Sequence, residues 1–225
     1  LPTTVIVPAG QTNAAFTATI INDTQIDGPQ TVWVTAHVQN WVDGSNSVMV
    51  LDNEPTNLVV TLPTLMREGQ GVLTNAGIVR IFGTWPTALT VNLVSSDVTD
   101  LTVPSSVVIP AGQTSAAFNI AAVDDTEQDG PQTVVVTAGA SGFAAGSAGT
   151  SVADNDIHHF SWSAIASPQS AGTPFSVTVA ALDITDIVIS NYTGTSSFSG
   201  IGANGSATLF PTGSGAFSNG RWTGS

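Results

Sequence analysis

Carboxylates are the side chains whose type and spacing could do chemistry in this sequence. Sixteen Asp and Glu residues face only three arginines and no lysine, so the formal net charge is −13. Like charges that converge without cationic partners repel one another unless a cation lies among them. Nine of these acids fall between residues 56 and 157, most of them in predicted loops or at predicted strand ends: Glu68, Asp97, Asp100, Asp124, Asp125, Glu127, Asp129, Asp154 and Asp156.

Calcium is the ion that such a set of ligands favours. Ca²⁺ takes about 6–8 oxygen ligands in flexible geometry, and carboxylates mixed with backbone carbonyls satisfy it. If the loops converge, the acids predict a calcium site. If they do not, the acids are solvated loop residues that keep an otherwise uncharged surface soluble.

One short motif has calcium-loop spacing. The run Asp125-Thr-Glu-Gln-Asp129-Gly130 matches the first half of an EF-hand loop, with acids at the first, third and fifth positions followed by Gly. The second half does not match, because Val136 stands where the bidentate Glu belongs, and the flanking residues read as strands. The motif therefore favours a calcium loop between strands over an EF-hand.

Other site chemistry is poorly represented. The sequence has no Cys, which excludes disulfides, thiolate catalysis and thiolate metal sites. His158 and His159 are adjacent and would point to opposite faces of a strand, so they do not chelate one ion together. We find no nucleophile elbow and no Ser-His-Asp set, and we predict a non-enzymatic chain without catalytic residues.

The overall composition limits the partners and the location. Nucleic acid and anionic membrane surfaces both attract clustered basic residues, which this chain lacks, and no apolar run is long enough to cross a membrane. No segment resembles a signal peptide. A composition rich in Thr, Ser, Val, Ala and Gly, without Cys or Lys, is typical of a secreted bacterial surface protein, so we predict an extracellular or cell-surface location.

The elements that must position the acids are strands. Segments such as Leu89–Leu93 and Val32–Ala36 alternate apolar and polar residues, which is the period of a half-buried strand. Turn residues punctuate the strands at the spacing of an antiparallel β-sandwich. For the middle of the chain we predict seven strands: Leu58–Leu62, Gly77–Phe82, Leu89–Ser95, Ser106–Ile109, Ala116–Val123, Thr133–Ala138 and Ser147–Ala153.

An internal repeat divides the chain. Residues Leu1–Glu54 align without insertion on Val103–Asp156, at an offset of 102 residues, which is the size of a domain. We expect three units: 1–55, corresponding to the C-terminal half of a module; 56–157, a complete module; and 158–225, a partial module with strands near Phe160–Trp162, Phe175–Ala181, Thr195–Ser199 and Arg221–Ser225. The first unit has no counterpart of the first strands of the second, so we expect a segment of a longer protein, or another source of those strands.

The ordered motifs of residues 56–157 resemble the Calx-beta domain. They are Glu68-Gly-Gln-Gly71, Ile109-Pro-Ala-Gly-Gln-Thr-Ser-Ala-Ala-Phe118, Val123-Asp-Asp-Thr126, Asp129-Gly-Pro-Gln132 and Val152-Ala-Asp-Asn-Asp156. The resemblance implies a seven-stranded sandwich that binds Ca²⁺ at one end through Glu68, Asp97, Asp124, Asp125, Asp154 and Asp156. Asp129 matches the first acid of the family's E-G-x-E stretch, but Gln132 replaces the second.

The resemblance extends to the other two units. The first unit retains Asp23, Asp27, Asp52 and Glu54 as an incomplete set, because it lacks counterparts of Glu68 and Asp97. The third unit resembles, more weakly, the immunoglobulin-like modules of large bacterial surface proteins, and with Asp183 and Asp186 as its acids it offers no obvious metal cluster.

The combined expectation is an all-β chain of tandem antiparallel sandwiches, immunoglobulin-like or Calx-beta-like. We predict a non-catalytic structural or adhesive spacer of a large bacterial secreted or cell-surface protein, stiffened by Ca²⁺, whose partners are neighbouring modules. Two alternatives stay open: an adhesin that binds a cell-surface glycan or protein, with Trp33 as one candidate contact, and an accessory region of a secreted enzyme.

Overall fold

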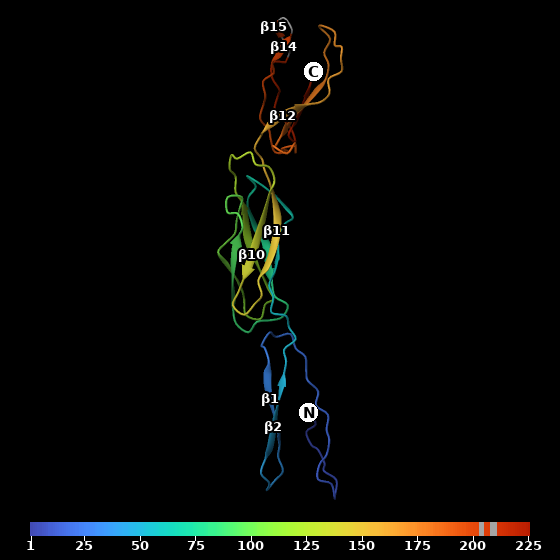
Figure 1. Cartoon of the computed structure of the whole chain (residues 1–225), viewed down its shortest axis with the longest axis vertical. Helices are drawn as coiled ribbons and strands as arrows, with labels where there is room; N and C mark the ends of the chain where they lie inside the picture. The colour runs from blue at the N-terminus through green and yellow to red at the C-terminus, as the bar shows by residue number, and fades with distance from the viewer. Residues whose placement is uncertain (203–204, 208–210) are drawn as a thin grey trace.

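The computed structural model describes residues 1–202, 205–207 and 211–225, and these residues form an all-β structure. Three groups of strands follow one another along the long axis: a hairpin, a central sandwich and a C-terminal group (Figure 1). None of the described residues forms a helix that could cross a membrane.

The central sandwich contains two sheets. One has the strand order β4-β11-β10-β6-β8 and the other β3-β5-β9-β7. The strands are β3 (Val59–Thr61), β4 (Leu65–Arg67), β5 (Gly71–Arg80), β6 (Leu89–Ser95), β7 (Leu101–Thr102), β8 (Ser106–Ile109), β9 (Ser115–Ala122), β10 (Gln132–Gly139) and β11 (Gly146–Ala153). All pairings are antiparallel except that of β4 with β11.

Alternating side chains build the core of this sandwich. Leu89, Val91 and Leu93 of β6 are buried while the residues between them are exposed, and Val134 and Val136 of β10 follow the same rule. This is the expected result for strands that bury one face against a second sheet. The predicted bounds of β6 and β8 agree with the structure.

Two strands and part of a third were not predicted from the sequence. β4 and β7 are three and two residues long, too short to carry a periodic pattern. β5 begins at Gly71 but changes register between Leu73 and Gly77, where Asn75 has a φ of 55°. Residues 74–76 lie opposite the single residue Asn119 of β9, so the alternation is interrupted there and the pattern was recognisable only after the irregularity.

The first group of strands is a single hairpin of β1 (Gln30–Ala36) and β2 (Gly44–Val50). These strands are the counterparts of β10 and β11, which pair with each other in the same register. The counterparts of β8 and β9, residues 4–7 and 13–20, form no strand. The reason is that β8 and β9 pair with β5, β6 and β7, all from residues 56–102, which the first repeat does not contain.

Both junctions between groups use the same loop of the repeat. Ile26 is buried in the core of the central sandwich, and its amide donates to the carbonyl of Thr84 at 2.9 Å. At the next junction its counterpart Gln128 donates its side-chain amide to the carbonyl of Ile157 at 2.8 Å. The loop of one repeat therefore contacts the residues that follow that repeat in both places.

The C-terminal group centres on a three-stranded sheet of β12 (His159–Trp162), β13 (Val177–Leu182) and β16 (Arg221–Gly224), with a separate ladder of β14 (Gly200–Gly202) and β15 (Gly205–Ala207). Val179, Ala181 and Phe217 form its small core. The strand predicted at Thr195–Ser199 is wrong, because only an isolated bridge between Ser197 and Gly213 occurs there.

Candidate metal site

Three strand ends converge at the end of the central sandwich that faces the C-terminal group. Glu68 directly follows β4, and Asp154 directly follows β11. Because β4 and β11 are parallel neighbours, their carboxyl ends meet, and the Glu68 amide donates to the carbonyl of Ala153 at 3.1 Å. Asp125 follows β9, whose last residue Ala122 pairs with Gly71, three residues after Glu68.

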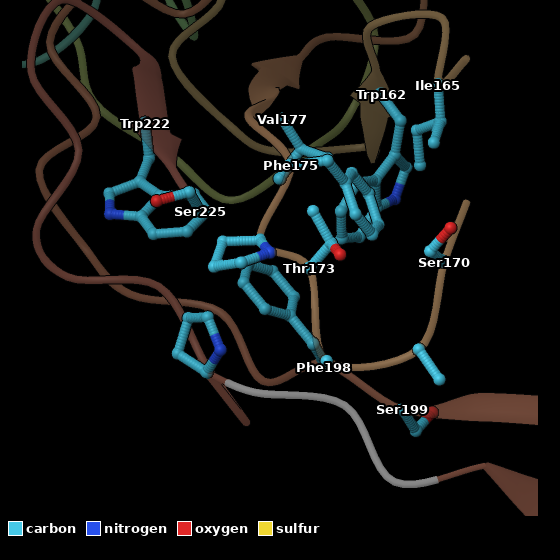
Figure 2. Close-up of a pocket in the computed structure, with 14 residues that line it drawn as sticks. Trp162, Ile165, Ser170, Thr173, Phe175, Val177, Phe198, Ser199, Trp222 and Ser225 are labelled. Carbon is cyan, nitrogen blue, oxygen red and sulfur yellow. The ribbon is translucent and has the colours of Figure 1, made fainter. Parts of the chain in front are cut away.

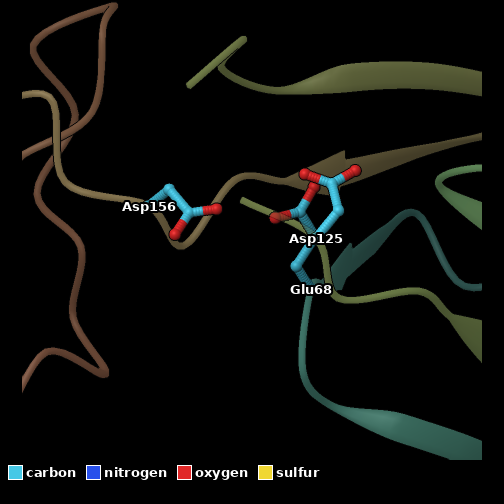
Figure 3. A group of neighbouring side chains, drawn as sticks. All are labelled: Glu68, Asp125 and Asp156. Carbon is cyan, nitrogen blue, oxygen red and sulfur yellow. The ribbon is translucent and has the colours of Figure 1, made fainter. Parts of the chain in front are cut away.

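The carboxylates of Glu68, Asp125 and Asp156 form a cluster. Each offers one oxygen, and these oxygens lie within 4.8 Å of one another. Figure 3 shows the Glu68 and Asp125 carboxylates side by side, with Asp156 on the segment that leaves β11. Three acids this close, none of which forms a salt bridge among the residues that the structure describes, are suited to hold a metal ion.

Two oxygens of this cluster have no hydrogen-bond partner. Among the described residues, three buried side-chain oxygens lack one, and two of them are Glu68 Oε2 and Asp156 Oδ2. Glu68 is only 3% exposed. A buried carboxylate oxygen without a donor is costly, and a bound cation would supply the missing partner.

The surrounding acids hold the loops in place. Asp154 Oδ2 accepts a hydrogen bond from the Gly130 amide at 3.0 Å, and its Oδ1 accepts one from the Asp156 amide at 2.6 Å. Asp124 Oδ1 accepts from Asn155 Nδ2 at 2.6 Å. These bonds tie the loop after β9 to the segment after β11.

A glycine allows the close approach of Asp124. Gly69 has a φ of 66°, and a Cβ placed there would lie 2.9 Å from Asp124 Oδ1. Both the left-handed backbone and the lack of space favour glycine at this position.

The electrostatics agree with a concentration of negative charge. The pKa of Glu68 is raised to about 7, mainly by burial and in smaller part by the charges of Asp125, Asp154 and Asp129, while a hydrogen bond from a backbone N–H of Asn155 lowers it. Burial is also the main cause of the raised pKa of Asp156, followed by the charge of Asp154. Both groups would keep their charge more readily beside a cation.

The other predicted ligands lie in different surroundings. Asp129 is exposed and close enough to raise the pKa of both clustered acids. Asp97 is not part of the cluster. Its carboxylate accepts hydrogen bonds from the hydroxyl and amide of Thr99, which lower its pKa. Its neighbour Asp100 was not selected from the sequence, although it is 5% exposed and has a raised pKa caused by burial and then by Asp97. The spacing Asp97-Val-Thr-Asp100 was the available signal.

The first repeat reproduces the loop but not the cluster. Asp52 accepts backbone hydrogen bonds from Asp27, Gly28 and Glu54, and the last two match the bonds that Asp154 accepts from Gly130 and Asp156. The Glu54 amide is the main reason why the pKa of Asp52 falls to about 2. Asp23, Asp27, Asp52 and Glu54 line a hollow of about 210 Å³. No three ligand atoms of residues 1–55 lie within 4.8 Å of one another, and this repeat has no counterpart of Glu68.

A second feature is an aromatic cavity of about 920 Å³ in the C-terminal group. It is lined by Trp162, Phe175, Phe198 and Trp222 together with small residues and hydroxyl groups (Figure 2). Within the described part of the chain, no charged side chain lines it. The ring centroids of Trp162 and Phe198 are 5.0 Å apart, and those of Phe198 and Trp222 are 5.3 Å apart.

Comparison with known proteins gives structural similarities only. No protein-family model and no curated protein matches the sequence. Among solved structures, CBD12 from CALX1.2, a Calx-beta domain, is similar with 16% identity and a TM-score of 0.42 over 74% of this chain and 73% of that one. Domains 4–9 of the surface layer protein SbsC are similar with 14% identity and a TM-score of 0.35, over 87% of this chain and 30% of that one. The Pseudomonas aeruginosa CupB2 chaperone is similar with 10% identity and a TM-score of 0.32, over 72% of this chain and 86% of that one.

Proposed function

We propose that this chain is a non-catalytic structural spacer in which Ca²⁺ stiffens the connection between the central sandwich and the C-terminal group. The main support for this proposal is the cluster of Glu68, Asp125 and Asp156, in which two buried oxygens lack a hydrogen-bond partner. The strongly acidic, Cys-free composition favours a secreted or cell-surface protein of bacterial type, where calcium is abundant. The partners of such a spacer are its neighbouring modules.

Glu68, Asp125 and Asp156 would hold the ion, and carbonyl groups of the same loops and water would complete a coordination of about 6–8 oxygens. Calcium would supply the positive charge that neutralises these acids. Asp154 acts as a positioning residue, because its bonds to the amides of Gly130 and Asp156 keep both loops at the site.

The same loops make the contact with the C-terminal group. Asp156 directly precedes Ile157, whose carbonyl accepts the Gln128 side chain at 2.8 Å. Gly130 lies against Ile184 and Thr185, since a Cβ placed on it would approach their side-chain carbons at 3.2 and 3.0 Å. An ion that fixes the loop of residues 124–130 and the segment of residues 154–156 would therefore restrict bending at this junction.

Small-angle scattering together with thermal unfolding, each in calcium and in EGTA, tests this function. We expect calcium to raise the melting temperature and to narrow the distribution of interdomain distances in the wild-type chain. The Asp125→Asn/Asp156→Asn variant should lose both effects. The charge-matched control Asp43→Asn/Glu127→Gln alters two exposed acids outside the cluster and should keep both. A rise in melting temperature without a change in scattering would retain the metal site and contradict the stiffening role.

The aromatic cavity supports a second candidate function, the binding of a neutral glycan by an adhesin. Indole rings such as those of Trp162 and Trp222 stack on sugar faces, and the hydroxyls of Ser170, Thr173 and Ser199 at the cavity could bond sugar hydroxyls. None of the lining residues that the structure describes has a charged side chain, which favours an uncharged ligand. Screening on a glycan array tests it. Binding that is lost in Trp162→Ala and kept in the control Trp33→Ala would support this function, and an array without any binding would contradict it.

A further inference from the structure

The hairpin of β1 and β2 exposes an apolar face, whereas the equivalent face of β10 and β11 in the second copy of the repeat is buried. This acceptor face consists of Val32 and Val34 of β1 with Val48 and Val50 of β2. Val32 pairs directly with Val48, and residues two apart on a strand share a face, so the four side chains lie on one side. Val32 is 43% exposed and Val48 47%.

The counterparts of these residues are core residues of the central sandwich. Val134, Val136 and Val152, which correspond to Val32, Val34 and Val50, are each 0% exposed. The two hairpins have the same register, so the difference does not arise from the hairpin itself. It arises from what lies over it.

The edges of the two hairpins differ in the same way. In the central sandwich, β10 pairs with β6 and β11 with β4. In the first repeat, β1 and β2 form a two-stranded sheet, and both outer edges are unpaired within the described part of the chain. Exposed edges of this kind accept a further strand.

Much of the core around this hairpin in the central sandwich comes from residues 56–102, and β9 adds Phe118 and Ile120. β4 supplies Met66, β5 supplies Val79, and β6 supplies Leu89, Val91 and Leu93, all of them buried. The first repeat aligns with residues 103–156 only, so it contains no segment of this kind. By analogy with the central sandwich, a segment that covers this face would contain strands with apolar residues such as Leu and Val, and no charged residues, at the inward positions.

We propose that the acceptor face binds a strand-forming polypeptide segment from outside residues 1–225, patterned like residues 56–102 of this chain. Its β6-like strand pairs antiparallel with β1. Transfer of the observed pairing, in which Leu93 lies opposite Ala138 and Ser95 opposite Val136, places the new strand along residues Val34–His37.

A second copy of the chain does not fit this role. In each copy β6 is already held between β10 and β8, so it has no free edge to give. Opening the central sandwich to release β6 would expose the core residues that this strand buries. The occupant is therefore a separate segment that is not yet part of a closed sheet.

The test supplies such a segment to the intact chain. A second copy of residues 56–102 is joined ahead of Leu1 through a flexible linker, which raises its effective concentration to the millimolar range. Hydrogen exchange is then measured in EGTA, so that calcium plays no part. We expect amide exchange in β1 and β2 to slow at least tenfold relative to the chain alone. A control segment with serines in place of its three β6 residues, Leu89, Val91 and Leu93, should give no such protection.

A matched pair of variants locates the contact. Val34→Asp places a charge on the acceptor face and should remove the protection, whereas Thr35→Asp adds the same charge on the opposite face and should keep it. Unchanged exchange with the wild-type segment would overturn the proposal. Light scattering that gives a dimer for the chain alone, with the acceptor face already protected, would also overturn it in favour of a second copy.

Discussion

Replacing Glu68 by Gln should stabilise the metal-free protein and remove its response to calcium. In the wild-type chain Glu68 is 3% exposed, and burial among acids raises its pKa from the ordinary 4.5 to about 7. Ionisation of Glu68 at neutral pH therefore costs the folded protein free energy. The shift corresponds to at most about 3 kcal/mol of unfolding free energy.

The pH dependence has a definite sign. Because the folded pKa lies above the unfolded one, the stability due to Glu68 is fully present below pH 4.5 and is lost as the pH rises to about 7. Glu68→Gln cannot ionise, and its amide can donate to the carboxylates of Asp125 and Asp156. We expect the free energy of unfolding of the variant to exceed that of the wild type by about 1–3 kcal/mol at pH 8 in EGTA, and this difference to vanish at pH 4.

Urea unfolding at pH 4, 6 and 8 measures these differences. Glu127→Gln is the charge-matched control, since Glu127 is exposed and outside the cluster, and it should change stability by less than about 0.5 kcal/mol. In 10 mM calcium, a site of the affinity usual for extracellular modules would stabilise the wild type by about 1–3 kcal/mol, and Glu68→Gln by much less. A variant less stable than the wild type in EGTA at pH 8 would refute the reasoning.

Two further substitutions test the local structure. Gly69→Ala places a Cβ 2.9 Å from Asp124 Oδ1 at a φ of 66°, whereas Gly112→Ala, at a φ of 73°, meets no atom within 4 Å. In urea unfolding we expect the free energy of unfolding to fall by about 2–3 kcal/mol in Gly69→Ala and by about 1 kcal/mol in Gly112→Ala. Only Gly69→Ala should weaken the calcium response. Equal losses would mean that the contact with Asp124 is unimportant. Ile26→Ala removes a side chain buried in the central core, so calorimetry should show the central sandwich destabilised by about 2 kcal/mol or more. The exposed Ile20→Ala is its control, and equal melting of the two variants would contradict the docking of this loop.

Much of the fold could be predicted because strand periodicity is local. β6 alternates Leu, Val and Leu with polar residues, and its bounds were predicted correctly. β4 could not be predicted, since three residues carry no period and its place beside β11 depends on a parallel pairing across the sandwich. The repeat predicted an incomplete first unit, but the loss of the β8 and β9 counterparts follows only from the pairing map.

The candidate site was predictable as a set of acids but not as individual roles. Glu68, Asp125 and Asp156 are placed together by the structure, at strand ends that the motif order had indicated. The use of Asp154 to bind backbone amides, and of Asp97 to bind Thr99, depends on loop conformations that no spacing encodes. Which acids carry the ion therefore stays a prediction.

Isothermal titration of calcium into the intact chain at pH 7.5 tests the central claim most directly. We predict saturable binding to the wild-type chain with a dissociation constant of about 10⁻⁴–10⁻³ M, the range of extracellular calcium modules. The Asp125→Asn/Asp156→Asn variant should show no such binding. Absence of binding to the wild type, or equal binding to the variant, would contradict a calcium site formed by Glu68, Asp125 and Asp156.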